Sequence, residues 1–521
     1  MRKRFDIAIL GSGFAGSLLA LLLKRQGFSV VLVEKDRHPR FVIGESSTPL
    51  ANLYLERIAR TFDVPELLPF AKYGSWKAHY PAIPVGKKRG FTFFWHQPGR
   101  SWEPTLHGQR AYLLVAASPH DAIADTHWFR PAFDAHLVEL ARCAGVVYLE
   151  ATTPLHAVET VHGMELMVEG PGGQEQLTAR FVVDATGAHA WLARQMGYKP
   201  ESHLHLPERI ALFAHFRHVA RADAWLASYQ DTWPYTPDDA AVHHMLEEGW
   251  AWVLHFDNGI TSLGFTLRSD RLPAQDAEAC WQQLLARYPS LQALLVQAQP
   301  LYSLRMLPER PVCFRQLTGR SWALLPSGVG ILDPLLSTGI PLTLLGVWRL
   351  ATLLSQYSGA PPLEALQHYQ TITLHEFDHT ARLIGGLWRV LDQPETFTAL
   401  SKLYFAAASF RETRLRLEKE SGIPGFLLSD HKTFVQQQEA LLAQLLQGNL
   451  PTSEALCAAL QPFDLAGLTE DRQGFYPARA EDALAACYKI PATREEVWAA
   501  LQRSGFIATD SAVKTQALEL L

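Results

Sequence analysis

The sequence predicts an α/β fold with a discontinuous Rossmann-type nucleotide-binding domain, a mostly antiparallel sheet domain and a C-terminal helical region. Three observations predict it. Strand, glycine-rich turn, helix and strand follow one another within the first 35 residues. Residues 205–325 consist largely of strand-like segments, and from about residue 350 the apolar residues recur at helical spacing.

The first unit is typical of a dinucleotide-binding turn. An apolar strand at residues 5–10 runs into Gly11-Ser12-Gly13-Phe14-Ala15-Gly16, and a helix over residues 17–26 leads to a second strand at residues 29–33. In such a unit the first glycine makes the tight turn and the second lets backbone N–H groups approach a pyrophosphate, while the third packs the helix on the strand. Glu34, followed by Lys35, stands where an acid accepts the hydroxyls of an adenosine ribose.

Later segments favour FAD as the dinucleotide. Gly44-Glu45-Ser46-Ser47-Thr48-Pro49 follows the second strand, and Arg130 opens a helix-like segment. A strand at residues 181–184 ends on Asp184 and turns at Gly187, behind a hairpin at residues 170–173. Much further on, Asp333-Pro334-Leu335-Leu336-Ser337-Thr338-Gly339-Ile340 leads into a helical run.

In this order the segments resemble the FAD-dependent monooxygenase superfamily, and within it the flavin-dependent halogenases, over about residues 5–350. Residues 44–49 resemble the loop that lies over the flavin, and residues 184–187 resemble the second nucleotide motif. Residues 333–340 resemble the segment around the isoalloxazine and ribityl chain, with Asp333 as the ribityl contact, and Arg130 falls where the superfamily places an arginine near the FAD. The resemblance implies FAD and a halide, chloride or bromide. The sequence has no second GxGxxG unit, so the flavin is reduced either by a partner reductase, which supplies FADH2, or by a nicotinamide that docks transiently.

The resemblance also implies a lysine that captures hypohalous acid. Lys72, in Lys72-Tyr73-Gly74, resembles the pattern that phenol and pyrrole halogenases carry beyond the flavin loop. An ammonium group donates hydrogen bonds to the acid, and a partly desolvated lysine with a lowered pKa can carry the halogen as a haloamine. The alternative is a solvated lysine in a loop that also contains Lys77, Lys87 and Lys88.

Two departures from the family bear on the substrate. Tryptophan halogenases carry a glutamate just before the serine of the segment at 333–340, where this chain has Leu336, so a phenol or pyrrole-like substrate is favoured over tryptophan. The family's Trp-x-Trp-x-Ile-Pro signature, which keeps the substrate away from the flavin, has the counterpart Trp250-Ala251-Trp252-Val253-Leu254-His255. Trp250 and Trp252 are therefore candidate active-site residues. Their alternation also fits sheet core, and the altered end of the signature leaves direct hydroxylation open.

The remaining segments complete the expected architecture. Asp257-Asn258-Gly259 predicts a hairpin turn, and the aromatic residues at 91–95, 128 and 129 are either walls for a flat substrate or plain core. The apolar spacing predicts helices at 363–381, 397–419 and 431–446, and the resemblance implies that they form a cap over the substrate. The expected domains are FAD-binding (1–85, 110–200 and 320–355), substrate-binding sheet (86–109 and 201–319) and helical cap (356–521).

Composition excludes several classes of protein. A net charge of −5, from 47 basic and 52 acidic residues, gives no reason to expect nucleic acid as a partner. Five dispersed cysteines without a CxxC pair favour the reducing cytoplasm. No stretch of 18 residues is apolar and free of charge or glycine–proline breaks, so no integral membrane segment is expected. His243 and His244 would point to opposite faces of a strand, so no metal site is expected.

Three functions stay open on sequence alone. The first is a flavin-dependent halogenase that acts on a small aromatic or apolar substrate, free or carrier-bound. The second is an FAD monooxygenase or reductase that acts on such a substrate directly. The third is a flavoprotein that binds FAD or a ligand without turnover.

Overall fold

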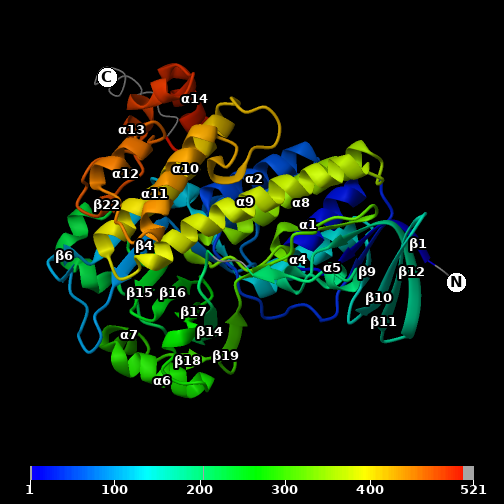
Figure 1. Cartoon of the computed structure of the whole chain (residues 1–521), viewed down its shortest axis with the longest axis horizontal. Helices are drawn as coiled ribbons and strands as arrows, with labels where there is room; N and C mark the ends of the chain where they lie inside the picture. The colour runs from blue at the N-terminus through cyan, green and yellow to red at the C-terminus, as the bar shows by residue number, and fades with distance from the viewer. Residues whose placement is uncertain (1–2, 203–204, 508–521) are drawn as a thin grey trace.

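The structure is a computed structural model and describes residues 3–202 and 205–507. It contains two large sheets and a layer of helices (Figure 1). In Figure 1 the first sheet lies at the right, near the N-terminus, and the second lies at the lower left. The long helices α8 (Gly339–Gln356) and α9 (Leu363–Arg389) run above them. The later helices gather at the upper left, where the C-terminus lies.

The first sheet has seven strands in the order β10-β11-β12-β1-β2-β9, with β21 paired to β12. β1 pairs in parallel with β2 and β12, as a Rossmann-type sheet requires, whereas β11 pairs antiparallel with both β10 and β12. The strands are β1 (Lys3–Leu10), β2 (Val30–Val33), β9 (Val147–Leu149), β10 (Thr153–Thr160), β11 (Gly163–Gly170), β12 (Gly173–Asp184) and β21 (Trp322–Leu324).

The second sheet has nine strands in the order β18-β14-β17-β16-β15-β4-β7-β22, with β19 paired to β14. Most of its pairs are antiparallel, and the expected hairpin joins β16 to β17. The strands are β4 (Gly90–Trp95), β7 (Tyr112–Ala116), β14 (Arg209–Arg217), β15 (Ala241–Met245), β16 (Gly249–His255), β17 (Ile260–Arg268), β18 (Gln299–Pro300), β19 (Arg305–Glu309) and β22 (Phe475–Tyr476).

Two strands of the second sheet lie outside the ranges expected for the sheet domain. β7 falls within 110–200, which the sequence assigned to FAD binding, yet it pairs antiparallel with β4. β22 falls within the expected cap, yet it pairs with β7. The C-terminal region is therefore built into the second sheet. The local pattern of a strand does not reveal which sheet it joins, because that choice depends on partners distant in sequence.

Six short strands complete the set: β3 (Val85–Lys88) pairs with β8 (Asp125–Trp128), and β5 (Thr105–Leu106) pairs with β6 (Gln109–Arg110). A further pair joins β13 (Glu201–Ser202) to β20 (Val312–Cys313). The other α-helices are α1 (Phe14–Arg25), α2 (Pro49–Thr61), α3 (Tyr73–His79), α4 (Arg130–Cys143), α5 (Trp191–Gln195), α6 (Ala277–Arg287), α7 (Pro289–Leu294), α10 (Pro394–Arg416), α11 (Lys432–Leu446), α12 (Ser453–Leu460), α13 (Ala480–Ala485) and α14 (Arg494–Ser504).

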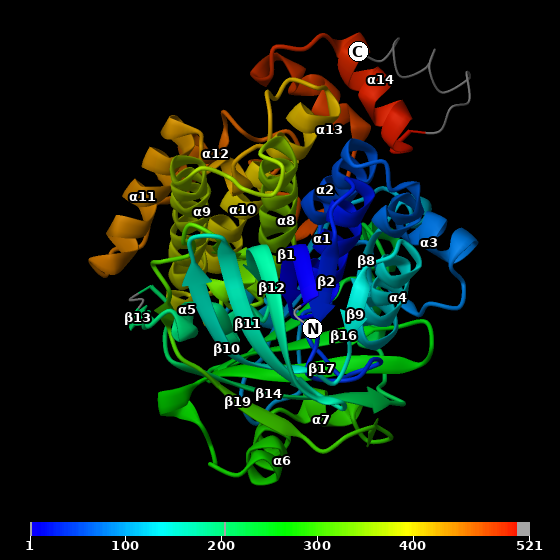
Figure 2. The ribbon, with the colours of Figure 1, turned by 90° about the vertical axis from the view of Figure 1, so that its right-hand side faces the viewer.

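The main hydrophobic core lies between the two sheets and the helix layer. Alternate residues of a strand enter different cores: Ile7 and Ile9 of β1 join the main core, whereas Ala8 and Leu10 pack on the other face of the first sheet. On β16, Trp250, Trp252 and Leu254 face the main core and Ala251 and Val253 face away. Figure 2 shows α1, α2 and α8 above the first sheet and the second sheet below it.

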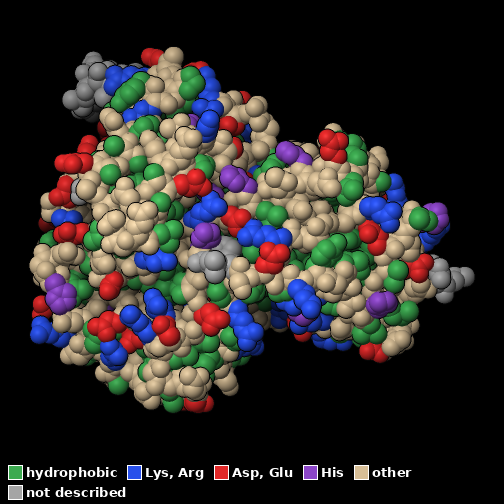
Figure 3. Space-filling view, viewed as in Figure 1, with side chains coloured by type: hydrophobic (Ala, Val, Ile, Leu, Met, Phe, Trp, Pro, Cys, Tyr) green, Lys and Arg blue, Asp and Glu red, His purple; other side chains and the backbone are tan. Residues whose placement is uncertain are grey.

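Helix α8 fills the centre of this core. Together with the preceding turn it forms the one described segment (Leu335–Gln356) that is long and apolar enough to cross a membrane, with a mean hydropathy of 1.3. Of its apolar window, 89% is buried inside the protein, where it packs on α1, α2 and α9. Its composition is therefore that of a core helix. On the surface in Figure 3, basic and acidic side chains are interspersed, as the small net charge leads one to expect.

Candidate active site

The glycine-rich turn between β1 and α1 has the expected backbone. Gly11 adopts φ +100°, and a Cβ on it would lie 2.6 Å from the carbonyl oxygen of Ala185. A Cβ on Gly16 would lie 2.0 Å from the carbonyl oxygen of Gly11, because the first turn of α1 packs directly on the turn. Both positions therefore exclude any side chain, as the roles predicted for the first and third glycines require.

Gly13 has a different environment, which fits a pyrophosphate. A Cβ on Gly13 would meet only the ends of polar side chains: Arg130 Nη2 at 3.6 Å, Arg40 Nη2 at 3.8 Å and Asp134 Oδ2 at 3.9 Å. Gly13 caps the N-terminus of α1, where free N–H groups and the positive end of the helix dipole favour an anion. Two guanidinium groups and a helix N-terminus thus form a cradle that the phosphates of FAD would fill.

Arg130 links this cradle to the loop at residues 44–49. The first residue of α4, it pairs through two nitrogens with Asp134 and donates from Nη1 to the carbonyl oxygen of Gly44 at 2.9 Å. Its guanidinium carbon lies 4.9 Å from the centroid of the Phe14 ring. The arginine therefore holds the loop against the start of α1, in the neighbourhood predicted for it.

Glu34 lies at the end of β2 and is 4% exposed. Its carboxylate accepts hydrogen bonds from the N–H and hydroxyl of Ser12, and Arg40 lies 3.3 Å away. Burial alone would raise the pKa of Glu34, but Arg40 and these N–H groups outweigh it and hold the pKa below its usual value. The neighbouring Lys35 is exposed. Among the described residues, Arg40 Nε beside Glu34 has no hydrogen-bond partner, so it is free for a cofactor.

Asp184 ends β12 and organises the next turn. One of its oxygens accepts from the N–H and hydroxyl of Thr186, and the other accepts from the N–H of Leu192 at 2.7 Å. Gly187 follows at φ +66° with open space around its Cα. The carboxylate thus shapes the backbone of the expected second nucleotide motif.

The expected flavin segments meet around one cavity of about 200 Å³, the flavin-side cavity. It lies where the loop at residues 44–49, strand β16 and the segment at residues 332–340 come together. Among the residues predicted from sequence, its lining contains Gly44, Glu45, Ser46, Trp250, Trp252, Asp333, Pro334, Ser337, Gly339 and Ile340. Ser47 lies beside it and Thr338 caps α8, whose N-terminus opens at Gly339. Sequence segments almost 300 residues apart therefore converge on a single cavity.

The segment at residues 333–340 is held under backbone strain. Leu336 and Ser337 adopt φ values of +65° and +57°, a region that costs non-glycine residues about 1 kcal/mol or more each. Asp333 secures the segment to the second sheet: it accepts from the Trp250 indole at 3.2 Å and from the Leu335 N–H at 2.9 Å. Arg209, also fully buried, lies 3.2 Å from its other oxygen. Such strain is typical of functional sites.

Trp250→Phe is expected to lower the free energy of unfolding by about 2 kcal/mol, because a hydrogen bond to the buried Asp333 carboxylate is lost. Trp252→Phe is the matched control, since its indole donates at 3.1 Å to the neutral hydroxyl of Ser262. That change is expected to cost about 1 kcal/mol less. Urea denaturation of both variants without FAD measures the difference, and equal losses would show that Trp250 is only packed there.

Lys88 is fully buried beside the flavin-side cavity. This differs from the solvated lysine that its loop predicts. Its Nζ donates to the carbonyl oxygen of Ser47 at 2.6 Å, to Ser46 Oγ at 2.9 Å and to Ser337 Oγ at 3.3 Å. It also lies 3.9 Å from the centroid of the Phe91 ring. Burial lowers the pKa of Lys88, and Asp125 opposes this effect. The ammonium thus bridges the two expected flavin segments.

Lys72, the lysine predicted to hold hypohalous acid, occupies a different place. Its Nζ donates at 2.6 Å to the carbonyl oxygen of Ser504, at the end of α14. Burial also lowers its pKa, with Glu56 opposing. Lys72 lines a second cavity, on the side away from the segment at residues 333–340. That Lys72 holds hypohalous acid therefore stays a prediction, and Lys88 is another candidate for this role.

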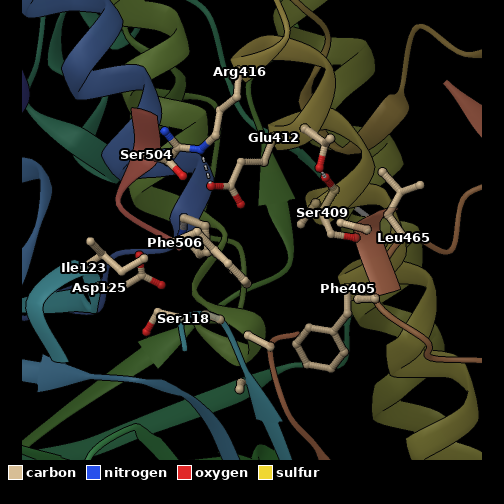
Figure 4. A pocket seen from close by; sticks show the side chains of 18 of the residues that line it. Ser118, Ile123, Asp125, Phe405, Ser409, Glu412, Arg416, Leu465, Ser504 and Phe506 are labelled. Carbon is tan, nitrogen blue, oxygen red and sulfur yellow. Dashed lines mark hydrogen bonds and ion pairs between the residues drawn. The ribbon is translucent and has the colours of Figure 1, made fainter. Parts of the chain in front are cut away.

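The second cavity, the ring cavity, has a volume of about 170 Å³ and lies between the second sheet and the C-terminal helices. Cavities of about 150 Å³ hold a benzene ring in other proteins. Figure 4 shows Asp125 and Ile123 on one side of it and Phe405, Ser409 and Leu465 on the other, with the Glu412–Arg416 ion pair above. Its walls are largely apolar, as a site for a flat ring requires. Residues of α10 and α14 line this cavity, and the role of the helical region as a cap over the substrate stays a prediction.

Of the aromatic residues considered as substrate walls, Phe91 alone lines the ring cavity within the described chain. Phe93 and Trp95 pack against Phe397, Trp128 packs against Phe14, and Phe129 stacks on His215. His255 contacts Thr261 and Asp238 on the outer face of β16, as its alternation predicts. His243 and His244 face opposite sides, and the described residues contain no cluster suited to a metal.

Sequence reasoning missed Lys88, Asp125 and Asn52. A signal for Lys88 was present, because Lys88-Arg89-Gly90-Phe91 repeats the Lys-x-Gly pattern that drew attention to Lys72. Asp125 and Asn52 carry no motif. They meet because β8 pairs with β3 in a register that places Asp125 opposite Lys88, and because Asn52 Nδ2 on α2 donates to Asp125 Oδ1 at 2.7 Å.

Comparison with known proteins gives consistent matches. The family model described as "Tryptophan halogenase" matches residues 126–397, just over half of the chain, and one described as "NAD(P)-binding Rossmann-like domain" matches residues 9–69. Monodechloroaminopyrrolnitrin halogenase PrnC of Pseudomonas fluorescens is 29% identical over 484 residues, which cover 87% of this chain and 83% of the relative. Tetracycline 7-halogenase of Kitasatospora aureofaciens is 27% identical over 65% of this chain and 61% of its own length.

A solved structure matches almost the whole chain. The crystal structure of halogenase PltM in complex with phloroglucinol and FAD superposes with a TM-score of 0.80 at 22% identity, covering 91% of this chain and 99% of that one. This likeness shows the fold: a Rossmann-type domain, a second sheet and C-terminal helices arranged as in PltM.

Proposed function

The chain belongs to the tryptophan halogenase family of FAD-dependent oxidoreductases, and we propose that it halogenates a small electron-rich aromatic, a phenol or pyrrole-like ring, rather than tryptophan. Leu336 supports this choice of substrate, because it places a buried apolar side chain where tryptophan halogenases carry a glutamate. The volume and apolar walls of the ring cavity also suit one small ring.

Bound FAD, reduced by a partner reductase, supplies the electrons with which dioxygen converts a halide into hypohalous acid. Residues of the protein position the cofactor and shield it from water. Arg40, Arg130 and the N-terminus of α1 would hold the pyrophosphate, and the residues of the flavin-side cavity would keep water away from the flavin ring. The N-terminus of α8, at Gly339, lines the same cavity and would stabilise a negative charge there.

We propose that Lys88 holds the hypohalous acid and passes its halogen to the substrate. The supporting observation is its position: it bonds to Ser46 and Ser337 of the flavin-side cavity and contacts Phe91, which lines the ring cavity. Its longest hydrogen bond, 3.3 Å to Ser337 Oγ, is the one that the acid would replace. Lys72 is the second candidate for this role, because it too is a partly desolvated amine that lines the ring cavity.

An assay with and without halide tests the proposed function. The assay contains purified protein, FAD, a flavin reductase, NADH and bromide, together with a panel of phenols, pyrroles and indoles. The masses of the products are measured by mass spectrometry. Bromide-dependent gain of one bromine on phenols or pyrroles is expected. Gain of one oxygen without halide would support the monooxygenase instead, which the replacement of proline by His255 in the tryptophan signature leaves open. Release of peroxide alone would contradict both.

We further infer the setting in which the enzyme works. The described chain contains one glycine-rich dinucleotide turn, so reducing equivalents come from a separate flavin reductase. The five cysteines are free, which suits the reducing cytoplasm. The substrate is small, and the same ring can arrive free or on a carrier. An assay of one pyrrole acid in both forms distinguishes the two.

A further inference from the structure

Asp125 lies at the boundary between Lys88 and the ring cavity. It is the first residue of β8 and the cross-strand partner of Lys88, the last residue of β3. Since partners in register point to the same face of a sheet, the carboxylate and the ammonium share one side of this pair. Asp125 is 4% exposed and lines the ring cavity, as Figure 4 shows. It is thus an acid placed where a substrate ring would meet the lysine.

The two carboxylate oxygens of Asp125 differ. Oδ1 accepts a hydrogen bond from Asn52 Nδ2 at 2.7 Å. Oδ2 is buried and receives no hydrogen bond from any residue that the structure describes. A buried carboxylate oxygen without a donor costs about 1–3 kcal/mol, and a hydrogen-bond donor on a bound ligand would recover that free energy. In the largely apolar ring cavity, a substrate O–H or N–H satisfies that need.

We propose that Asp125 is the substrate-facing base of this enzyme: Oδ2 accepts the O–H or N–H that activates the aromatic ring, and takes its proton as Lys88 delivers the halogen. The inference rests on the proposed function and narrows the substrate class. The ring must carry a hydrogen-bond donor, as phenols, arylamines and pyrroles do. A ring activated only by an ether or an alkylated nitrogen lacks the contact.

The proton transfers balance. As the ring carbon attacks the halogen of the hypohalous acid, the carbon–halogen bond forms and the halogen–oxygen bond breaks. The hydroxide that leaves takes a proton from the Lys88 ammonium and becomes water, while the O–H or N–H proton passes to Asp125. The halogenated ring is then neutral. It becomes aromatic again as its ring C–H proton restores the Lys88 ammonium and Asp125 returns its proton to the heteroatom. The ring carbon is oxidised by two electrons, and the halogen is reduced from +1 to −1.

The groups around Asp125 set the pH at which it can act. Burial raises the pKa of Asp125, and the negative charge of Glu412 on α10 raises it further. The positive charges of Lys88 and Arg416 and the hydrogen bond from Asn52 lower the pKa. Tyr404 and Lys72 are further titratable residues that line the same cavity. A base must be ionised, so turnover is expected to rise with pH as Asp125 loses its proton, and to fall at higher pH as Lys88 loses its own.

Ligand binding without turnover is the first test. The dissociation constants of a phenol and its methyl ether are measured by calorimetry for the wild-type protein and for Asp125→Asn. The asparagine keeps an oxygen for Asn52 and the same volume. Wild type is expected to bind the phenol about 10- to 100-fold more tightly than the ether. The variant is expected to bind the two equally, and a preference retained within about threefold of that of wild type would overturn the inference.

Steady-state halogenation is the second test, with Glu412→Gln as the matched control. Glu412 is a carboxylate of the same cavity, but its Oε1 already accepts from Arg416 Nε at 2.8 Å. Asp125→Asn is expected to lower kcat/KM for the phenol about 100-fold and to remove the acidic limb of the pH profile, with little effect on the ether. Glu412→Gln is expected to keep the phenol-to-ether ratio. An acidic limb that persists in Asp125→Asn would contradict the base role.

The two tests separate this inference from the proposed function. If the wild-type protein prefers the phenol and Asp125→Asn abolishes that preference, the contact at Oδ2 is supported. This holds even if no halide-dependent product forms, and in that case only the proposed function fails. Halide-dependent products from a wild-type protein that shows no preference in binding or in kcat/KM overturn the inference and leave the proposed function standing.

Discussion

Replacing Lys88 by methionine is expected to lower bromide-dependent product formation about 1,000-fold or more, while FAD binding and NADH-driven peroxide release continue. Methionine retains the bulk of the lysine stem but removes the ammonium that bonds Ser46, Ser47 and Ser337. Without that group nothing holds hypohalous acid between the two cavities, and a positioned proton donor is worth about 10²–10⁴ in rate. Single-turnover halogenation, followed beside peroxide release, measures the effect.

Lys72→Met is the matched comparison for that experiment. Lys72 lines the ring cavity and Lys88 contacts Phe91, which lines it too, but Lys72 is occupied with the carbonyl oxygen of Ser504 at the end of α14. Loss of the Lys72 ammonium is expected to loosen α14 and to raise KM by about tenfold or less. One charge-assisted hydrogen bond is worth about 1.5–3 kcal/mol, and only part of that free energy contributes to substrate binding. The reverse pattern, with Lys72→Met inactive and Lys88→Met active, would assign the reaction to Lys72.

Gly13→Ala is expected to weaken FAD binding about 100-fold or more without unfolding the protein. Gly13 has φ −63°, which alanine adopts freely, and the nearest atoms to the new Cβ would be the ends of the Arg130, Arg40 and Asp134 side chains, at 3.6, 3.8 and 3.9 Å. The methyl group would nevertheless occupy the cradle between these guanidinium groups and the N-terminus of α1. Loss of two charge-assisted phosphate contacts, each worth about 1.5–3 kcal/mol, gives at least this factor. Quenching of FAD fluorescence on binding provides the dissociation constant.

Gly16→Ala serves as the contrasting variant. Its Cβ would lie 2.0 Å from the carbonyl oxygen of Gly11, so the helix must move away from β1 and the free energy of unfolding is expected to fall by about 2–4 kcal/mol. Thermal unfolding without FAD should therefore separate the two variants: Gly13→Ala near wild type and Gly16→Ala well below it. Equal destabilisation would indicate that Gly13 acts on packing and not on the cofactor.

Helix and strand positions were predictable wherever the apolar pattern was long. The expected strands at 5–10 and 29–33 correspond to β1 (Lys3–Leu10) and β2 (Val30–Val33), and the hairpin after Trp252 is present. α9 extends to Arg389, beyond the expected end at 381, because Leu383, Ile384 and Leu387 continue its buried face. β7 joins the second sheet against expectation, since pairing with β4 is a long-range contact.

The sequence by itself determined the cofactor and the family. Steric constraints within one short turn require Gly11 and Gly16, whereas Gly13 leaves space for the phosphates, and this pattern is visible in the order of the residues. The same holds for the loop at residues 44–49 and for the segment at residues 333–340, whose residues line one cavity as a group.

Only the tertiary structure decided which lysine bridges the two segments at residues 44–49 and 333–340 and which acid stands opposite that lysine. Both Lys72 and Lys88 stand in Lys-x-Gly patterns, and nothing local distinguishes them. Lys88 is fully desolvated because Ser46 and Ser337, separated by 291 positions, close around it, and Asp125 comes to its side through the pairing of β3 with β8. Desolvation and charge proximity set the reactivity of an amine or a carboxylate, and both arise from contacts between distant segments.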